Sequence, residues 1–516
     1  MRRSRRSEAR AGPERAADGV AAVILTVRGV VIAGAVPAEK NKAAAVAADL
    51  RARGVVVIAL TWVDNSGVTR VKGVPVGRLE RAAKSGVGAS PVFDGFLLND
   101  GIVAGRYAGG PVGDLRLFPD LDRIVPLAAQ PGWAWAPVDR FDQLGRSHPQ
   151  DARSILRREA EAFAELELLA LAGIEIEWTV YPADTPAGTV PEPAAPGPAY
   201  GMGRVIEQSD YLSDLIRALS DQGLRVDQIH PEYAPGQFEV SIAPEDPVGA
   251  ADSSVLVRQT IRAIGARHGL RTSFSPALVA AGVGNGGHAH VSLRRPERPG
   301  EGGSREVFVD GTGPAGLSAL GEQFTAGILD HLPALLAVGA PSVASYLRLE
   351  PSRWAGAFAC WGVENREAAL RLVTGLAVGG QAAQAPGAEL KASAEQWFAA
   401  SPNLEIKCFD LTANPYLMLA GLLACGRSGI ERKARLPGPV DVDPATLSAR
   451  ERASRRIEPL PARLGDAVTA FERDPVLLAA FGPELHETIT TVRCAEIDLF
   501  AAATPDEIVT ETIWRH

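Results

Sequence analysis

Cysteine is rare in this chain: its 516 residues include four, and no two of them form a C-x-x-C pair. Scattered cysteines argue against a disulfide scaffold or a thiolate metal site, and they suit a reducing cytoplasm. Long apolar runs are missing too, since no stretch is long enough to cross a bilayer. We therefore predict a cytoplasmic protein without a membrane segment.

A surplus of basic charge is also lacking. The net charge is −8 and the sequence pI is about 5.7, which argues against nucleic acid or an anionic membrane as a partner. The basic exception, MRRSRRSEAR, is predicted to belong to a disordered tail over residues 1–19. The apolar run 20–27 is followed by Arg28 and no cleavage-site pattern, so we expect no export signal.

Two common nucleotide-binding motifs are missing. No G-x-x-x-x-G-K-[ST] occurs in the chain. Gly282, Gly284 and Gly287 have the G-x-G-x-x-G spacing, but the HAHVSL that follows alternates like a strand, whereas the dinucleotide motif requires a helix there. An ATP site in this protein would therefore be built from metals, arginines and a sheet.

The chain does have length and an apolar content of 46%, which suit a soluble globular protein of two or more domains. Residues 20–138 predict a small α+β domain, with strands in VAAVILTV, VVVIALTWVD and GFLLNDGIVAG around an amphipathic helix that ends at Gly54. A segment rich in proline, glycine and polar residues then marks the boundary to a second domain, residues 139–516.

The second domain repeats one pattern, an amphipathic helix followed by strands. The first repeat predicts a helix over SILRREAEAFAELELLALAG and a strand over IEIEWTVY, and the stretch from about Leu411 is predicted to be mainly helical. A mostly antiparallel sheet with helices on one face would give this alternation of helix and strands along the chain. The predicted fold class is therefore α+β.

Glutamates gather at the predicted strand ends. Glu175 and Glu177 alternate with apolar residues and would share one face of a strand, where like charges repel unless the face is solvated. Glu232 and Glu239 flank a Pro-Gly turn and can point back at one place, and Glu405 lies on another predicted strand. A single pair of this kind is more often part of the surface than of a site.

His288 and His290 lie two residues apart on a predicted strand, so they would project to the same face. Either histidine alone is more often structural. Five glutamates and a histidine together, however, are hard to bury as unpaired charge, and a bound cation explains them economically. Ligation mainly by oxygen with one imidazole favours Mg²⁺ or Mn²⁺ over Zn²⁺.

Three arginines form a further candidate set: Arg348 in SYLRLEPSRW, and Arg366 and Arg371 in ENREAALRL. Each of them alone is typical of a surface. Beside divalent metals, arginines can hold the charge of a transferred phosphoryl group, so the set indicates phosphoryl transfer.

Six strings resemble the glutamine synthetase family in their order and approximate separations: IEIEW, EYAPGQFE, GNGGHAHVSL, SYLRL, ENREAALR and NLEIKCFDLTANPYLMLAG. The resemblance covers most of the chain from about residue 20. It implies an N-terminal β-grasp-like domain, a C-terminal catalytic α+β domain, and a homo-oligomer, a dodecamer of two stacked hexameric rings, with active sites between neighbouring subunits. The implied substrates are ATP, glutamate and an amine or ammonium, with two or more divalent metal ions in each site.

The same resemblance implies roles for individual residues. The ligands of one metal would be Glu177, Glu232 and Glu239, and those of a second would be Glu175, His288 and Glu405. The nucleotide contacts would be His290 and Ser292, the phosphate contacts Arg366 and Arg371, and the glutamate contact Arg348. Asp64 would be the aspartate that one subunit lends to its neighbour's site to bind and deprotonate ammonium. Asp64 and Arg366 are the predicted catalytic residues.

The implied reaction has two steps. ATP first phosphorylates the γ-carboxylate of glutamate, because a carboxylate oxygen is a poor leaving group, and the amine then displaces phosphate. Metals and arginines stabilise the phosphoryl group, and a carboxylate near the amine takes its proton.

Three positions depart from the family pattern. Trp354 stands where glutamine synthetases have a flap glutamate that closes the ammonium site, and an indole can wall an apolar pocket or stack on a cationic amine. Lys407 replaces an arginine that grips the amino acid. Val283 aligns with an asparagine that contacts glutamate, unless Asn285, beside Gly286, substitutes for it.

These departures alter the substrate pockets and leave the metal and ATP residues in place. That pattern favours a γ-glutamyl-amine ligase, which joins glutamate to an organic amine. Two alternatives remain: an ammonium-using glutamine synthetase with a divergent flap, and a non-catalytic relative that keeps the fold. Metal-dependent phosphate release would exclude the non-catalytic relative.

Overall fold

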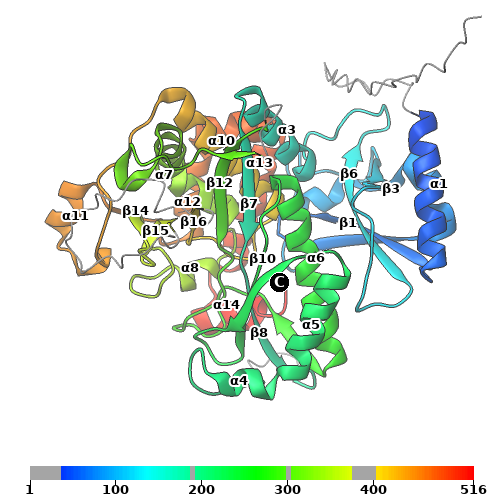
Figure 1. Ribbon diagram of the computed structural model, residues 1–516, viewed down its shortest axis with the longest axis horizontal. Coiled ribbons are helices and arrows are strands. Elements are labelled where there is room, and N and C mark those ends of the chain that lie inside the picture. The colour runs from blue at the N-terminus through cyan, green and yellow to red at the C-terminus, as the bar shows by residue number, and fades with distance from the viewer. Residues whose placement is uncertain (1–35, 186–191, 298–303, 375–401) are drawn as a thin grey trace, which may run out of the picture.

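The computed structural model describes residues 36–185, 192–297, 304–374 and 402–516. Figure 1 shows a smaller N-terminal body, in blue and cyan, beside a larger body that holds the rest of the chain. The predicted tail 1–19 and the predicted strand VAAVILTV lie outside the described residues. Among the described helices, none is long and apolar enough to cross a membrane.

The smaller body is a sheet with the strand order β2-β1-β6-β4-β3, and β5 pairs with β6. Strand β1 runs antiparallel to β2 and parallel to β6. Alternate residues of β1, Ile58 and Leu60, belong to one apolar core with Leu50 of α1 and Leu79 of α2. The elements are α1 (Val36–Ala52), β1 (Val57–Val63), β2 (Thr69–Pro75), α2 (Leu79–Ser85), β3 (Val87–Ala89), β4 (Leu115–Pro119), β5 (Val125–Pro126) and β6 (Trp133–Phe141).

Two predictions for this body meet different outcomes. The predicted helix end is confirmed, because Gly54 has a left-handed φ of 78° and its N–H donates to the carbonyl of Arg51. The predicted strand in GFLLNDGIVAG is wrong: a short 3₁₀ helix ends at Gly95, and a single bridge between Phe96 and Ile102 closes a turn. The side chain of Asn99 accepts the N–H of Gly101, a turn contact that competes with strand pairing. Strand β6 continues past the predicted boundary at 138.

The described residues of the larger body form two sheets instead of the single predicted sheet. The four-stranded sheet has the order β11-β8-β10-β9, and the seven-stranded sheet has the order β13-β12-β16-β15-β14-β17, with β7 paired to β12. Pairing is antiparallel throughout except between β14 and β15. The strands are β7 (Leu169–Ile174), β8 (Ile176–Pro182), β9 (Val226–Pro231), β10 (Gln237–Ile242), β11 (Leu270–Ser273), β12 (Ala289–Arg295), β13 (Arg305–Glu306), β14 (Phe358–Val363), β15 (Ala368–Val373), β16 (Asn403–Ile406) and β17 (Glu458–Pro459).

Helices supply most of the remaining core, and the chain after Leu411 is mainly helical, as predicted. Helices α7 and α10 cross so closely that a Cβ on Gly327 would lie 2.3 Å from the carbonyl oxygen of Cys425 and 2.7 Å from the Cα of Gly429. The helices are α3 (Ala152–Glu165), α4 (Met202–Glu207), α5 (Ser209–Asp221), α6 (Pro247–Arg267), α7 (Ala319–Gly339), α8 (Ser345–Arg348), α10 (Pro415–Arg432), α11 (Ala449–Arg455), α12 (Leu464–Glu472), α13 (Pro475–Leu499) and α14 (Pro505–Thr512).

The first helix-strand repeat of the larger body is divided differently from the prediction. Helix α3 ends at Glu165, and Glu167 is left-handed with a φ of 55°, so LLALAG continues as strand β7. The predicted strand IEIEWTVY is interrupted at Glu175, because β7 pairs with β12 in one sheet whereas β8 pairs with β10 and β11 in the other. Glu175 therefore lies where the chain passes between the two sheets.

Candidate active site

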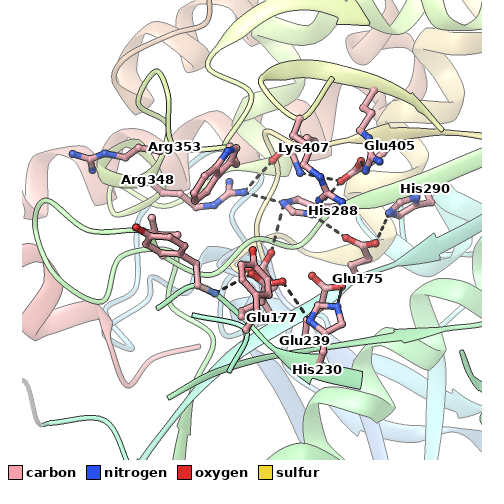
Figure 2. A pocket seen from close by; sticks show the side chains of 18 of the residues that line it. Glu175, Glu177, His230, Glu239, His288, His290, Arg348, Arg353, Glu405 and Lys407 are labelled. Atoms are coloured by element: carbon pink, nitrogen blue, oxygen red, sulfur yellow. Dashed lines mark hydrogen bonds and ion pairs between the residues drawn. The ribbon is translucent and has the colours of Figure 1, made fainter. Parts of the chain in front are cut away.

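A cavity of about 720 Å³ is lined by residues of both sheets of the larger body. Across the four-stranded sheet, His230 of β9 and Glu177 of β8 are both register partners of Glu239 on β10, so the three residues form a row. His230 Nε2 lies 3.4 Å from Glu239 Oε1, and His230 Nδ1 lies 3.5 Å from Glu232 Oε1. Figure 2 shows the row on one side of the pocket.

The other side of the cavity belongs to the seven-stranded sheet. Glu175, at the junction, meets two imidazoles: His288 Nδ1 lies 3.0 Å from its Oε2, and His290 Nε2 lies 3.1 Å from its Oε1. His288 Nδ1 also lies 3.4 Å from Glu405 Oε1. Because β12 pairs with β16, His290 is the register partner of Glu405. Both histidines thus project to one face, as their spacing predicts.

The glycine loop before β12 allows these groups to converge. The N–H of Gly286 donates to Glu177 Oε2 at 2.8 Å, and Gln237 Nε2 donates to the same oxygen at 2.7 Å. A Cβ on Gly286 would lie 2.4 Å from His288 Nε2 and 2.8 Å from Arg348 Nη2. No side chain fits at this position without moving these groups.

The carboxylates and imidazoles perturb one another strongly. Burial and then the charges of Glu175 and Glu177 raise the pKa of Glu239 to about 8. Burial also acts against ionised Glu405, but the charge of Lys407 and the nearby histidines outweigh it and lower the Glu405 pKa to about 2. Burial of Glu239 beside Glu175 and Glu177 therefore disfavours its ionised form, and a bound cation would favour that form.

The histidine pKa values differ with their partners. A hydrogen bond to Glu239 raises the pKa of His230 to about 9. Burial opposes charge on His290, but Glu175 raises its pKa to about 9. Burial, followed by the charge of Lys407, lowers the pKa of His288. A neutral His288 agrees with its geometry, because Arg348 Nη2, which can only donate, lies 3.1 Å from His288 Nε2.

Two groups of three side chains could each hold a metal ion, with ligand atoms within 4.8 Å of one another: Glu175, His290 and Glu405, and His230, Glu232 and Glu239. Oxygen donors dominate both groups, which fits Mg²⁺ or Mn²⁺. In the predicted set of Glu177, Glu232 and Glu239, His230 takes the place of Glu177. In the predicted set of Glu175, His288 and Glu405, His290 takes the place of His288. Glu177 and His288 lie between the groups, with Glu177 Oε1 3.8 Å from His288 Nε2.

His230 is absent from the sequence prediction, although a signal for it existed. It lies two residues before Glu232, the spacing that sets two side chains on the same face of an extended chain. Tyr200 and Tyr233, which also line the cavity, were missed as well. Tyr233 directly follows Glu232, but nothing in the local pattern marks Tyr200.

The predicted cations surround the same cavity. Arg371 Nη1 donates to Glu405 Oε2 at 2.9 Å, and Lys407 Nζ donates to Glu405 Oε1 at 3.0 Å. Arg348 is buried and also donates to the carbonyl oxygens of Lys407 and Phe409. Arg366 is exposed at the cavity.

Trp354 lines the cavity and is 43% exposed. Its indole packs edge-on against the ring of Tyr233, with a centroid distance of 5.1 Å. Its backbone is left-handed, with a φ of 55°, and its N–H donates to Glu367 Oε1 at 2.9 Å.

Ser292, Asn285 and Asp64 are predicted site residues that do not line the large cavity. Ser292 lines a neighbouring cavity of about 380 Å³, which shares Glu175 and His290 with the first. Asn285 is fully buried and does not line the large cavity: Thr179 donates to its amide oxygen, and its amide nitrogen donates to two backbone carbonyls. The amide of Asn285 is thus used within the fold, and its contact with the substrate stays a prediction.

Asp64 also lies away from the cavity of its own chain. Its buried carboxylate accepts the N–H groups of Ser66 and Val68, and Arg70 Nε donates to it at 2.7 Å. Burial raises the pKa of Asp64 to about 6. A single chain therefore holds this carboxylate in a turn at the junction of the two bodies, where Asn414 donates to the carbonyl oxygen of Asp64.

Known proteins match both the sequence and the fold. The family model described as glutamine synthetase, catalytic domain, matches residues 149–511. A gamma-glutamylpolyamine synthetase of Streptomyces coelicolor, GlnA3, is 47% identical over 94% of this chain and 99% of that protein. A glutamine synthetase of Thermotoga maritima is 31% identical over 75% of this chain and 81% of that protein.

Two solved structures agree with these matches. The crystal structure of a novel glutamine synthase homolog has a TM-score of 0.74 and 32% identity, covering 90% of this chain and 99% of that one. A GmaS/ADP complex has a TM-score of 0.74 and 26% identity, covering 89% of this chain and 97% of that one. The chain belongs to the glutamine synthetase family. It is an ATP-dependent ligase that joins the γ-carboxylate of glutamate to an amine through γ-glutamyl phosphate.

Gly286→Ala tests the convergence of the site. The new Cβ would also lie 2.9 Å from Glu177 Oε1, and the three crowded groups are side-chain ends that can move aside. We expect the fold to persist while turnover falls by roughly a hundredfold, the usual effect of an ångström-scale misplacement. The measurement is phosphate release, with the melting temperature as a fold check.

The matched control is Gly438→Ala, since a Cβ there would meet nothing within 4 Å. Wild-type turnover in Gly286→Ala would show that the close approach of these groups is dispensable.

Proposed function

We propose that the amine substrate is an organic amine and that polyamines are its class. The observation that carries this proposal is the cavity wall at Trp354, where an exposed indole and the ring of Tyr233 pack together and line the same cavity as the carboxylates. An aromatic wall attracts an alkylammonium group through dispersion and cation–π contact but gives ammonium no ion pair. The 47% identity to a gamma-glutamylpolyamine synthetase supports the same class.

For the metal ions, we assign one site to His230, Glu232 and Glu239 and another to Glu175, His290 and Glu405, with Glu177 and His288 between them. Mg²⁺ or Mn²⁺ held there would neutralise the carboxylates and stabilise the charge on the transferred phosphoryl group. The burial of Glu239 among Glu175, Glu177 and Glu232, which raises its pKa, supports a cation beside it. This arrangement remains close to the two predicted ligand sets.

The remaining roles follow from charge and position. Arg366, exposed at the cavity, is assigned to the phosphates of ATP together with Arg371. Arg348 and Lys407 are assigned to glutamate, and Gly286 shapes the space beside them. His290 and Ser292, which line the neighbouring cavity, are assigned to the nucleotide.

For the assembly, we propose a homo-oligomer, a dodecamer of two stacked hexameric rings, in which Asp64 serves the neighbouring subunit. The N-terminal body would be the β-grasp-like domain, ending with β6. Asp64 lies away from its own cavity, so it can act on an amine only across an interface, where it must be released from Arg70 to accept a proton. Since the reaction consumes ATP, we place it in the cytoplasm.

Glu239→Gln tests the metal assignment. A buried acid with its pKa raised from 4.5 to about 8 keeps its proton in the folded state, so the free energy of unfolding falls as pH rises between these values. Added Mg²⁺ should reverse this loss at pH 8 in the wild type. The variant should show a weaker pH dependence, a smaller Mg²⁺-induced rise in melting temperature, and little metal-dependent phosphate release.

Glu161→Gln, at an exposed position of α3, is the matched control. A large Mg²⁺-induced stabilisation of Glu239→Gln, equal to that of the wild type, would contradict the assignment of Glu239.

Trp354→Glu tests the amine class. The wild type should release phosphate faster with at least one primary amine than with ammonium at equal concentration. The variant should shift the ratio of the two rates toward ammonium, by up to roughly a hundredfold if a carboxylate beside the small cation contributes about 2.7 kcal/mol. Should ammonium be the best nucleophile of the wild type across polyamines, alkylamines and aminoalcohols, the protein would be a glutamine synthetase with an unusual flap.

Subunit complementation tests the role of Asp64. Asp64→Asn and Glu232→Ala subunits should each be inactive, and refolding them together should restore part of the activity, because some interfaces then combine two intact halves. Glu232→Ala refolded alone is the control. Verified mixed oligomers without recovered activity would count against a shared site.

A further inference from the structure

The aromatic part of the cavity wall, Trp354 and Tyr233, is held in place by contacts within the chain. Trp354 is fixed at two points: its N–H donates to Glu367, and its indole packs on Tyr233. The residue two positions earlier, Ser352, is also left-handed, with a φ of 57°, and its hydroxyl donates to Asp443 at 2.8 Å. Left-handed backbone at non-glycine residues persists only where surrounding contacts hold it. The flap therefore presents the indole in one orientation.

The partner ring is fixed as well. The backbone N–H of Tyr233 donates to Glu232 Oε2 at 3.1 Å, and the hydroxyl of Tyr200 is hydrogen-bonded to the same carboxylate. The aromatic pair therefore begins one residue from an acidic group of the site. Tyr233 is 44% exposed and Trp354 is 43% exposed, so both rings present free surface although they pack on each other.

Arg353 is a cation next to the aromatic pair that could repel a positively charged ligand, but its charge has partners within the chain. Arg353, the neighbour of Trp354, is ion-paired with Glu350 at 2.6 Å and donates to the carbonyl oxygen of Gly282. Its charge is therefore largely balanced. The exposed aromatic faces remain available to a cation, whose carbon chain would gain dispersion contact with the same rings.

We propose that Tyr233 and Trp354 form a subsite for the carbon chain and the distal ammonium of a diamine or polyamine whose other nitrogen attacks the glutamyl phosphate. This inference rests on the proposed function, and it adds Tyr233 as a specificity-determining residue. Glu367 is a positioning residue: it acts on the amine through the backbone of Trp354. Discrimination between a diamine and a small amine arises here, because methylamine and ammonium are too short to occupy both the attack position and the rings.

The experiment compares KM values for four nucleophiles: ammonium, methylamine, n-butylamine and 1,4-diaminobutane. Tyr233→Leu should raise the KM for 1,4-diaminobutane roughly five- to tenfold, the loss expected for a partly desolvated cation–π contact. The KM for n-butylamine should rise less, and those for methylamine, ammonium and glutamate should change by less than about twofold. Tyr233→Phe retains the ring and should recover the diamine KM relative to Tyr233→Leu.

Glu367 provides an independent readout. Glu367→Ala removes the acceptor of the Trp354 N–H and should raise the diamine KM, with a smaller effect on the KM for glutamate. Glu367→Gln keeps an amide oxygen as acceptor and should recover most of the loss. Trp133→Leu, an exposed tryptophan of the smaller body outside this cavity, is the matched control for loss of a surface aromatic.

The outcomes separate the two proposals. If the wild type uses no organic amine faster than ammonium, the proposed function and the subsite both fall. If the wild type prefers 1,4-diaminobutane but Tyr233→Leu raises the KM for every nucleophile equally, or for none, the aromatic subsite alone is overturned. A KM for glutamate that changes much less than the KM for 1,4-diaminobutane in each variant shows that the cavity is still folded.

Discussion

The repulsion among buried carboxylates at the junction of the two sheets is the constraint on which the site depends. Glu177 and Glu239 are direct cross-strand partners, and Glu175 adds its charge from the connection between the sheets. Like charges so placed destabilise a sheet unless cations or protons compensate them. The histidines, Lys407 and Arg371 compensate part of the charge, and burial beside the other carboxylates raises the pKa of Glu239. Divalent cations bound there would compensate the remaining charge.

This convergence depends on backbone features more than on the acidic residues themselves. The passage from β7 to β8 moves the chain between two sheets at Glu175, so one short sequence contributes to both halves of the site. The glycine loop before β12 contributes in a different way, because Gly286 leaves room for His288 and Arg348 to approach Glu177. Side chains from segments far apart in the sequence can therefore meet within one cavity.

The proposed function divides the two halves of the reaction between parts of this cavity. Phosphoryl transfer is assigned to its carboxylates, histidines and arginines, most of which are positioned by the pairing of β8, β10, β12, β15 and β16. The amine side is assigned to Trp354 on an exposed flap and to Tyr233 at the turn after β9. Substitutions in these connecting segments can change the nucleophile without disturbing the sheet, which is consistent with a family that contains both glutamine synthetases and a gamma-glutamylpolyamine synthetase.

The sequence by itself determined the chemistry. The acidic and imidazole side chains, the arginines and the unusual tryptophan at position 354 could all be recognised in it, because residue type and period-two spacing are local properties. It also indicated a mixture of helices and strands and the end of α1 at Gly54. Only the tertiary structure decided which groups lie close enough to share a cation, because that depends on strand partners far apart in the chain. Pairing of β9 with β10 brought His230 to Glu239, and the change of sheet at Glu175 broke a strand that its alternation had predicted to be continuous. Hydrogen bonds likewise hold the amide of Asn285 away from the lining of the cavity, because its buried partners meet it only in the folded chain.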